Sequence, residues 1–208
     1  MKNIERFLKY VSFDTQSNPY SNTSPSSKTQ FELGNYLVNE LKEIGINNAY
    51  MDEYGYVYAY IPSNCNSSKT IGLIAHMDTS FDASGRNIKP TIIDSYDGST
   101  IKYANNPNIE LSPKEFPSLN KKLGHKLIIT DGSTLLGADD KAGITIIMST
   151  VEEILNSKND YPNIIVTFTP DEEIGEGTKN FNYNYYKERN CSFAYTLDGG
   201  YIEEISFE

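Results

Sequence analysis

The chain has few cysteines and no long apolar run. Among its 208 residues only Cys65 and Cys191 are cysteines, and neither is part of a CxxC pair. This indicates free thiols in a reducing cytosol, with a single disulfide as the alternative. No run of ~18 apolar residues occurs, and the first eleven residues are amphipathic rather than uniformly apolar. We therefore expect a cytoplasmic protein that is neither secreted nor membrane-spanning.

Positive charge is also scarce. The sequence has 18 Lys and Arg against 28 Asp and Glu, a net charge of -10. Such a balance argues against nucleic acid or an anionic membrane surface as a partner, and it remains compatible with metal cations. The 38% of hydrophobic residues, with 12% aromatic, is enough for a sizeable core in one large domain or two small ones.

Apolar periodicity predicts an α/β protein. A helical stripe continues to Gly45 after Ser27 and Gln30, which have capping-box spacing. Strand, helix and strand then follow one another, an order typical of a mostly parallel, mixed sheet flanked by helices. The predicted helices are 3–12, about 30–45, 141–155 and, as a helix or loop, 179–189; the predicted strands are 48–53 and 55–62 as a hairpin, 71–75, 126–130, 163–170, 193–200 and 203–208.

The region from about 80 to 125 departs from this pattern. It contains Pro90, Pro107, Pro113 and Pro117 among short β-like pieces. A structureless loop of this length is uncommon in a compact domain, so we expect an irregular insertion with one or two hairpins. The chain stops at Glu208 within a strand-like segment, and we expect it to be a fragment of a longer protein.

Polar residues stand directly after four of the predicted strands. In open α/β sheets, ligand sites lie beyond the carboxyl ends of the strands. Convergence of so many carboxylates requires protonation or a cation, and oxygen ligands with an imidazole suit zinc, cobalt or manganese. The strand ends carry one imidazole and seven carboxylates, from His76, Asp78, Asp139, Asp140, Asp171, Glu172, Glu173 and Asp198.

Each of these residues also has a structural interpretation. His76 could be a satisfied core histidine, but Asp78, two residues on, can accept its second ring N–H as in a metal site. Glu172 and Glu173 could form a solvated acidic turn, or divide metal binding and proton transfer between them.

The remaining acids have similar alternatives. Asp140 could complement the dipole of the helix that follows, with Lys141 as its counter-ion. Asp198 could instead cap the turn at Gly199 and Gly200. Two adjacent carboxylates such as Asp139 and Asp140 repel each other when desolvated, so we favour a cation beside them.

Five segments, in this order, resemble one known family: VSFDTQSN, IAHMDTSFDASG, TDGSTLLGADDKAGI, FTPDEEIGEG and YTLDGG. They are similar to the tripeptide aminopeptidases of the M20 family of di-zinc metallopeptidases, from about Arg6 to Glu208. The resemblance implies that residues 1–208 are the N-terminal portion of a catalytic domain with a zinc-exopeptidase-like αβα sandwich. The family's lid and dimerisation domain and its C-terminal segment are missing from this sequence.

The resemblance also implies a role for each site residue. Asp139 would bridge two zinc ions, and the peptide bond that follows it would be cis. Other metal ligands would be His76 and Asp198 on the first zinc and Glu173 on the second, with Asp78 orienting His76 and Glu172 as general base.

The implied function is metal-dependent release of the N-terminal residue from tripeptides, by a metal-activated water with Glu172 as general base. The implied partners are a small peptide substrate and, for the full-length protein, a second copy in a homodimer. The family's second zinc also uses a late histidine, whereas this chain has only His76 and His125. We therefore expect an incomplete second zinc site and impaired activity.

Three other functions stay open. Another M20-type amidohydrolase, such as a dipeptidase, aminoacylase or carboxypeptidase, would share the metal chemistry but not the substrate. A glycoside hydrolase could use paired carboxylates without metal. A truncated homologue could serve for binding only.

Overall fold

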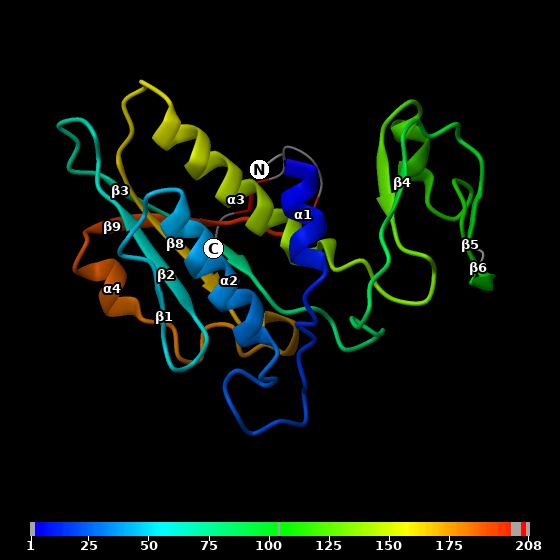
Figure 1. Cartoon of the computed structure of the whole chain (residues 1–208), viewed down its shortest axis with the longest axis horizontal. Helices are drawn as coiled ribbons and strands as arrows, with labels where there is room; N and C mark the ends of the chain where they lie inside the picture. Colours follow the sequence, from blue (N-terminus) through cyan, green and yellow to red (C-terminus); the bar gives the residue numbers. More distant parts are fainter. Residues whose placement is uncertain (1–2, 104, 201–204, 207–208) are drawn as a thin grey trace. The chain divides into compact units, whose positions relative to one another are not determined.

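The computed structural model describes residues 3–103, 105–200 and 205–206. It divides into two compact units (Figure 1). The main unit comprises Met1–Phe81 and Gly137–Glu208, and the small unit comprises Asp82–Leu136. None of the helices in the described part of the chain is long and apolar enough to cross a membrane.

The main unit is built from one sheet and the helices on its faces. Its sheet has the strand order β1-β2-β8-β3-β9. Strands β8, β3 and β9 run parallel to one another, whereas β1 and β2 form an antiparallel hairpin and β2 pairs antiparallel with β8. The elements are α1 (Asn3–Val11), α2 (Gln30–Glu43), β1 (Tyr50–Met51), β2 (Val57–Ile61), β3 (Thr70–His76), α3 (Ala138–Asn156), β8 (Asn163–Thr169), the 3-10 helix η2 (Glu172–Ile174), α4 (Tyr183–Lys187) and β9 (Cys191–Thr196).

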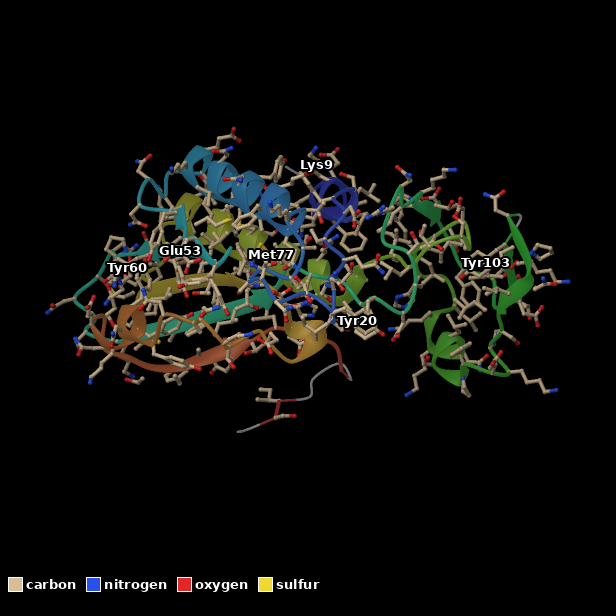
Figure 2. The ribbon with its side chains drawn as sticks, turned by 90° about the horizontal axis from the view of Figure 1, so that it is seen from below. Lys9, Tyr20, Glu53, Tyr60, Met77 and Tyr103 are labelled. Carbon is tan, nitrogen blue, oxygen red and sulfur yellow. The ribbon has the colours of Figure 1, made fainter. Side chains whose placement is uncertain are left out.

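Alternation along β2 explains why both faces of the sheet are covered. Successive side chains of a strand point to opposite faces. Val57, Ala59 and Ile61 join the larger core with side chains of α2 and α3, whereas Tyr56 and Tyr58 pack on the other face with Tyr185 of α4. Figure 2 shows the main sheet between these layers, with Met77 labelled in the interior. The α/β sandwich predicted from the sequence is thereby confirmed.

A buried ionic network fixes α1 against its neighbours. The Arg6 guanidinium donates to Glu40 of α2 at 2.7 Å and to Glu152 of α3 at 2.6 Å. The Tyr10 hydroxyl donates to the same Glu40 at 2.7 Å. Arg6, Tyr10 and Glu40 are almost fully buried. The three helices are therefore joined by charge-assisted hydrogen bonds as well as by apolar packing.

Two local predictions are wrong. The strand predicted at 126–130 forms β7 (Leu127–Ile129), which pairs with β4 (Thr91–Ile93) in the small unit and not with the main sheet. The parallel crossover therefore runs from β3 to β8, with α3 between them. The capping box at Ser27 is absent because α2 begins at Gln30 without a side-chain cap, and the Gln30 amide donates to Asp171 instead.

The small unit contains two two-stranded antiparallel sheets. One pairs β4 with β7, and the other pairs β5 (Ile101–Tyr103) with β6 (Asn106–Leu111). The 3-10 helix η1 (Pro117–Lys122) lies between β6 and β7 in the sequence. This unit continues to Leu136, beyond the insertion expected at about 80–125. The last predicted strand, at 203–208, lies mostly outside the residues that the structure describes.

Candidate metal centre

Register in the parallel part of the sheet brings the candidate residues to one edge. His76, the last residue of β3, pairs with Thr169, the last residue of β8. The Met77 amide continues the contact by donating to the Thr169 carbonyl at 2.8 Å. The segment that carries Glu172 and Glu173 therefore leaves the sheet beside the segment that carries Asp78, as expected for the carboxyl ends of parallel neighbours.

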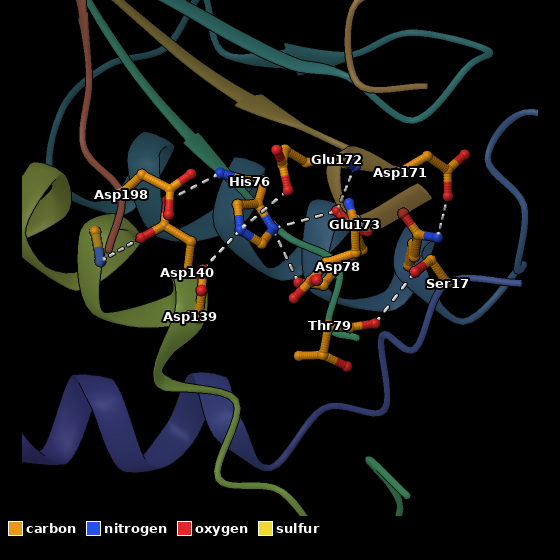
Figure 3. A network of polar contacts seen from close by, with 12 residues as sticks. Ser17, His76, Asp78, Thr79, Asp139, Asp140, Asp171, Glu172, Glu173 and Asp198 are labelled. Carbon is orange, nitrogen blue, oxygen red and sulfur yellow. Dashed lines mark hydrogen bonds and ion pairs between the residues drawn. The ribbon is translucent and has the colours of Figure 1, made fainter. Parts of the chain in front are cut away.

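The His76 ring is buried and held on both nitrogens (Figure 3). Its Nδ1 lies 3.0 Å from the backbone carbonyl oxygen of Asp78 and 3.3 Å from a carboxylate oxygen of the same residue. Its Nε2 lies 2.9 Å from Asp139 Oδ1 and 3.9 Å from Glu172 Oε2. With Nδ1 occupied by Asp78, Nε2 is the nitrogen directed toward the other carboxylates.

Asp78 has a second set of contacts that links the two strand ends. Its fully buried carboxylate accepts the backbone N–H of Glu172 at 2.9 Å and that of Glu173 at 3.1 Å. These amides belong to η2, a turn whose first N–H groups have no partners of their own. Asp78 thus sets the position of His76 and of the turn that carries both glutamates.

The adjacent acids Asp139 and Asp140 occupy different environments at the start of α3. The peptide bond between them is cis, as the resemblance implies. Asp140 is buried, and its carboxylate accepts the backbone N–H groups of His76 at 3.1 Å and Gly143 at 3.1 Å. Asp139 is exposed and reaches His76. Asp140 therefore anchors the start of the helix, and Asp139 faces the candidate site.

Lys141 has a different partner from the one that its sequence position indicates. Its side chain is fully buried, and Nζ donates to the backbone carbonyl of Phe13 at 2.8 Å. Burial lowers the pKa of Lys141 to about 7, although the nearby carboxylates of Asp14 and Asp78 oppose that shift. In the structure Lys141 fixes the loop that follows α1.

Asp198 follows β9 and reaches the same edge of the sheet. Its carboxylate accepts the Gly199 N–H at 2.5 Å, so it does cap the glycine turn. An oxygen of Asp198 also lies within 4.8 Å of ligand atoms of His76 and Asp140. The contact with Gly199 agrees with the turn interpretation, and the role of Asp198 as a metal ligand stays a prediction.

The carboxylates and the imidazole shift one another's protonation. Burial disfavours the charged form of His76, but hydrogen bonds to Asp139 and Asp78 outweigh it and raise the pKa of His76 to about 11. The hydrogen bond to His76 holds the pKa of Asp139 below its usual range. Burial raises the pKa of Asp140 to about 8, and burial also raises the pKa values of Glu172 and Glu173. In the absence of a cation, the site retains protons.

The donor set fits a divalent metal ion. Ligand atoms of His76, Asp139 and Glu173 all lie within 4.8 Å of one another, and so do those of His76, Asp140 and Asp198. Imidazole nitrogen with carboxylate oxygen is a ligand set typical of zinc, cobalt and manganese. The resemblance assigns Asp198 with Asp139 to one zinc, and in the structure the Asp198 side chain lies beside both Asp139 and Asp140.

Asp171 is the one strand-end acid that points away from this cluster. Its buried carboxylate accepts hydrogen bonds from Ser26 and Gln30. The expectation that all seven strand-end carboxylates converge is therefore wrong for Asp171. Sequence reasoning also missed Ser26 and Gln30, because Gln30 has capping-box spacing with Ser27 and Ser26 lies in a polar loop without a local signal.

Comparison with known proteins identifies the relatives of the chain. No family model matches it. Peptidase T of Alkaliphilus oremlandii is 50% identical over 213 residues, covering 100% of this chain and 51% of the relative. Peptidase T of Bacillus subtilis is 49% identical, covering 99% of this chain and 50% of the relative. The whole chain is therefore similar to about half of peptidase T. The similarity confirms the resemblance drawn from the five segments, and the chain spans about half the length of these curated relatives.

Solved structures agree on the fold. Aminopeptidase PepT from Bacillus cereus superposes with a TM-score of 0.65 at 21% identity, covering 95% of this chain and 43% of that one. A tripeptidase from Staphylococcus aureus gives a TM-score of 0.64 at 22% identity, covering 96% and 43%. At 21% and 22% identity, the likeness to these two solved structures concerns the fold alone.

Proposed function

We propose that this chain supplies most of the metal site of a zinc-dependent aminopeptidase, which releases the N-terminal residue from small peptides, tripeptides in particular. The observation that carries the proposal is the single buried imidazole, His76, directed into a group of carboxylates at metal-binding separations. Identity of about half over the entire chain to peptidase T supports a peptidase rather than an unrelated metalloprotein.

The residues of the cluster take the roles that their contacts allow. His76, Asp139, Asp198 and Glu173 would hold the metal, and Asp78 keeps the His76 ring in place. When bound, the metal supplies positive charge that polarises a peptide carbonyl and lowers the pKa of water. Asp140 stays a structural anchor, because backbone N–H groups occupy both of its oxygens.

Glu172 would move the proton. Its carboxylate is exposed, lies 3.9 Å from His76 Nε2 and stands on the turn held by Asp78. A base in this position takes a proton from the attacking water and returns it to the leaving amine. Burial raises the pKa of Glu172. A raised pKa favours this role, because the carboxyl must hold the proton between the two steps.

The proposed second metal position is incomplete in this chain. Asp139 and Glu173 would contribute to it, but His76, which the first position would use, is the only imidazole in the described cluster. Oxygen ligands alone bind zinc less favourably than a set containing imidazole. We therefore propose one firmly bound metal per chain, with peptide hydrolysis far below that of a complete enzyme.

Metal analysis combined with substrate comparison tests the function. We expect about one zinc per chain by mass spectrometry, retained in Glu172→Gln and lost in His76→Gln. Residual release of N-terminal residues should disappear in Glu172→Gln and with EDTA. The matched control is Glu176→Gln, which changes a glutamate of the same loop outside the cluster and should behave like wild type.

Two results would contradict the proposal. Absence of bound zinc in the wild-type chain would favour a truncated homologue used for binding. Hydrolysis that survives EDTA would favour metal-free carboxylate chemistry. Faster cleavage of dipeptides or N-acyl amino acids than of tripeptides would leave the proposed metal site standing. It would contradict the proposed substrate and favour another M20-type amidohydrolase.

A further inference from the structure

The turn that carries Glu172 and Glu173 is attached to the fold through the residue before it. Asp171 lies between β8 and η2 with a left-handed backbone (φ 58°). Its carbonyl accepts the Glu176 N–H at 2.9 Å, and the Glu172 carbonyl accepts the Gly175 N–H at 2.8 Å. The loop from Asp171 to Glu176 is thus closed by its own backbone, and its orientation depends on what holds Asp171.

The Asp171 side chain is fixed by three donors from outside the loop. Its Oδ2 accepts the Ser26 N–H at 2.7 Å. Its Oδ1 accepts the Ser26 hydroxyl at 2.5 Å and the Gln30 amide at 2.7 Å. Asp171, Ser26 and Gln30 are each at least 94% buried. Buried hydrogen bonds to a carboxylate are strong, and leaving one of these groups unpaired would be costly.

This cluster connects the turn with α2 and with the polar loop that precedes it. Gln30 is the first residue of α2. The Ser26 hydroxyl oxygen also accepts the N–H of Asn18 at 2.9 Å, so the loop is held in the same cluster. On the opposite side, Asp78 holds the amides of Glu172 and Glu173. The turn is therefore held by two carboxylates, one from its own chain segment and one from the end of β3.

We propose that Asp171, together with Ser26 and Gln30, is a positioning site that fixes the directions of Glu172 and Glu173. The inference rests on the proposed function in that it makes those two glutamates the functional pair. The Asp171 carboxylate contacts Ser26 and Gln30 and is not part of the group of candidate metal ligands. It acts through the backbone of the turn, and loss of its three donors would let the turn rotate about its two ends.

Two substitutions separate backbone preference from side-chain anchoring. Asp171→Gly keeps the left-handed conformation accessible but removes the carboxylate. Asp171→Asn also tolerates this conformation. If the side-chain amide of Gln30 flips, the NH2 group introduced at position 171 can donate to Gln30 Oε1, which has no hydrogen-bond partner among the described residues. We expect the turn to loosen in the order wild type, Asp171→Asn, Asp171→Gly.

Native-state hydrogen exchange of this chain measures the turn directly, without metal. In Asp171→Gly the amides of Glu172 and Glu173 should exchange on the order of tenfold faster or more, while the amide of Val166 in β8 keeps its wild-type rate. Ser26→Ala, which removes one of the three donors, should give a smaller change in the same direction. The matched control is Glu40→Gln, another buried carboxylate on the helix that bears Gln30, and it should not affect these two amides selectively.

Unchanged exchange of Glu172 and Glu173 in Asp171→Gly would overturn the positioning role. If that variant does not fold, Ser26→Ala decides: selective acceleration supports the role, and wild-type exchange refutes it. Zinc titration is the second measurement. Ligand atoms of Glu173 lie within 4.8 Å of those of His76 and Asp139, so a misplaced Glu173 in Asp171→Gly should lower the zinc affinity of that group about tenfold. A wild-type chain that binds no zinc would refute the proposed function, whereas the exchange result would still decide the role of Asp171.

Discussion

Zinc binding to this chain should release protons, because the structure places a protonated imidazole where a metal ligand is needed. The pKa of His76 is raised to about 11, whereas zinc binds the neutral ring. At neutral pH His76 must therefore give up its proton. The pKa of His76 lies about four pH units above neutrality, so the apparent affinity for zinc at pH 7 should be about 10⁴-fold below that of the chain with a deprotonated His76. This competition is the main electrostatic cost of loading the site.

The sign of the pH dependence follows. Each unit of rising pH makes the deprotonated ring about tenfold more available, so the apparent association constant should rise about tenfold per pH unit around neutrality. Asp140, with a pKa of about 8, adds to the release below that pH, since a nearby cation favours its ionised form. Both groups therefore increase the proton release.

Calorimetric titration with zinc in buffers of different ionisation enthalpy measures the protons released. We expect the heat to vary linearly with buffer enthalpy, with a slope of at least about one proton per zinc. His76→Gln should bind weakly and lose this slope, whereas His125→Gln, which changes the other histidine, should keep it. A heat independent of the buffer, or an affinity that does not change with pH, would refute the reasoning.

Other predictions concern stability and the anchors of the site. In the metal-free chain, the stabilising contribution of the His76 proton is complete below about pH 6.5 and is lost as pH rises toward 11. Lys141, with its pKa lowered to about 7, has the opposite effect over part of this range, so the difference in urea midpoint between wild type and His76→Gln is the quantity to measure. The advantage of wild type should shrink as pH rises; an advantage that grows with pH would contradict this. Replacing Arg6 by Met leaves Glu40 buried without its cation and should cost ~3–5 kcal/mol of unfolding free energy while zinc affinity stays unchanged; a Tm equal to wild type would show that the network is unimportant. A Cβ at Gly143 would contact Asp140 Oδ1 and lie 2.6 Å from the Leu197 carbonyl oxygen, so Gly143→Ala should lower both stability and zinc affinity. The control for Gly143→Ala is Ala142→Ser, a substitution at the neighbouring position on α3. Equal zinc binding by Gly143→Ala and wild type would count against the anchoring role of Asp140.

Local sequence determined most of the helices and strands. The apolar stripe after Lys141 and the continuous apolar runs at 71–75 and 163–170 correspond to α3, β3 and β8, because burial on one helix face or on both sheet faces leaves a direct periodic signal. The five quoted segments also indicated the homology with peptidase T. His76, Glu173 and Asp198 were found because parallel strands place the residues at and after their carboxyl ends at one edge of the sheet. Asp139 reaches the same edge from the start of α3, because the strand predicted before it belongs to the small unit.

Pairing partners and side-chain directions were decided only by the tertiary structure. The strand at 127–129 has an ordinary β pattern, and nothing in its residues says that it pairs with β4 in the small unit. Asp171, Glu172 and Glu173 are consecutive acids, yet Asp171 turns to Ser26 and Gln30 while Glu173 joins His76 and Asp139. Such choices depend on donors that are far away in the sequence, from Ser26 to Asp171, and a local pattern carries no information about them. The sequence thus identified which groups reach the edge of the sheet, and the tertiary contacts decided which of them face the metal position and which hold the others in place.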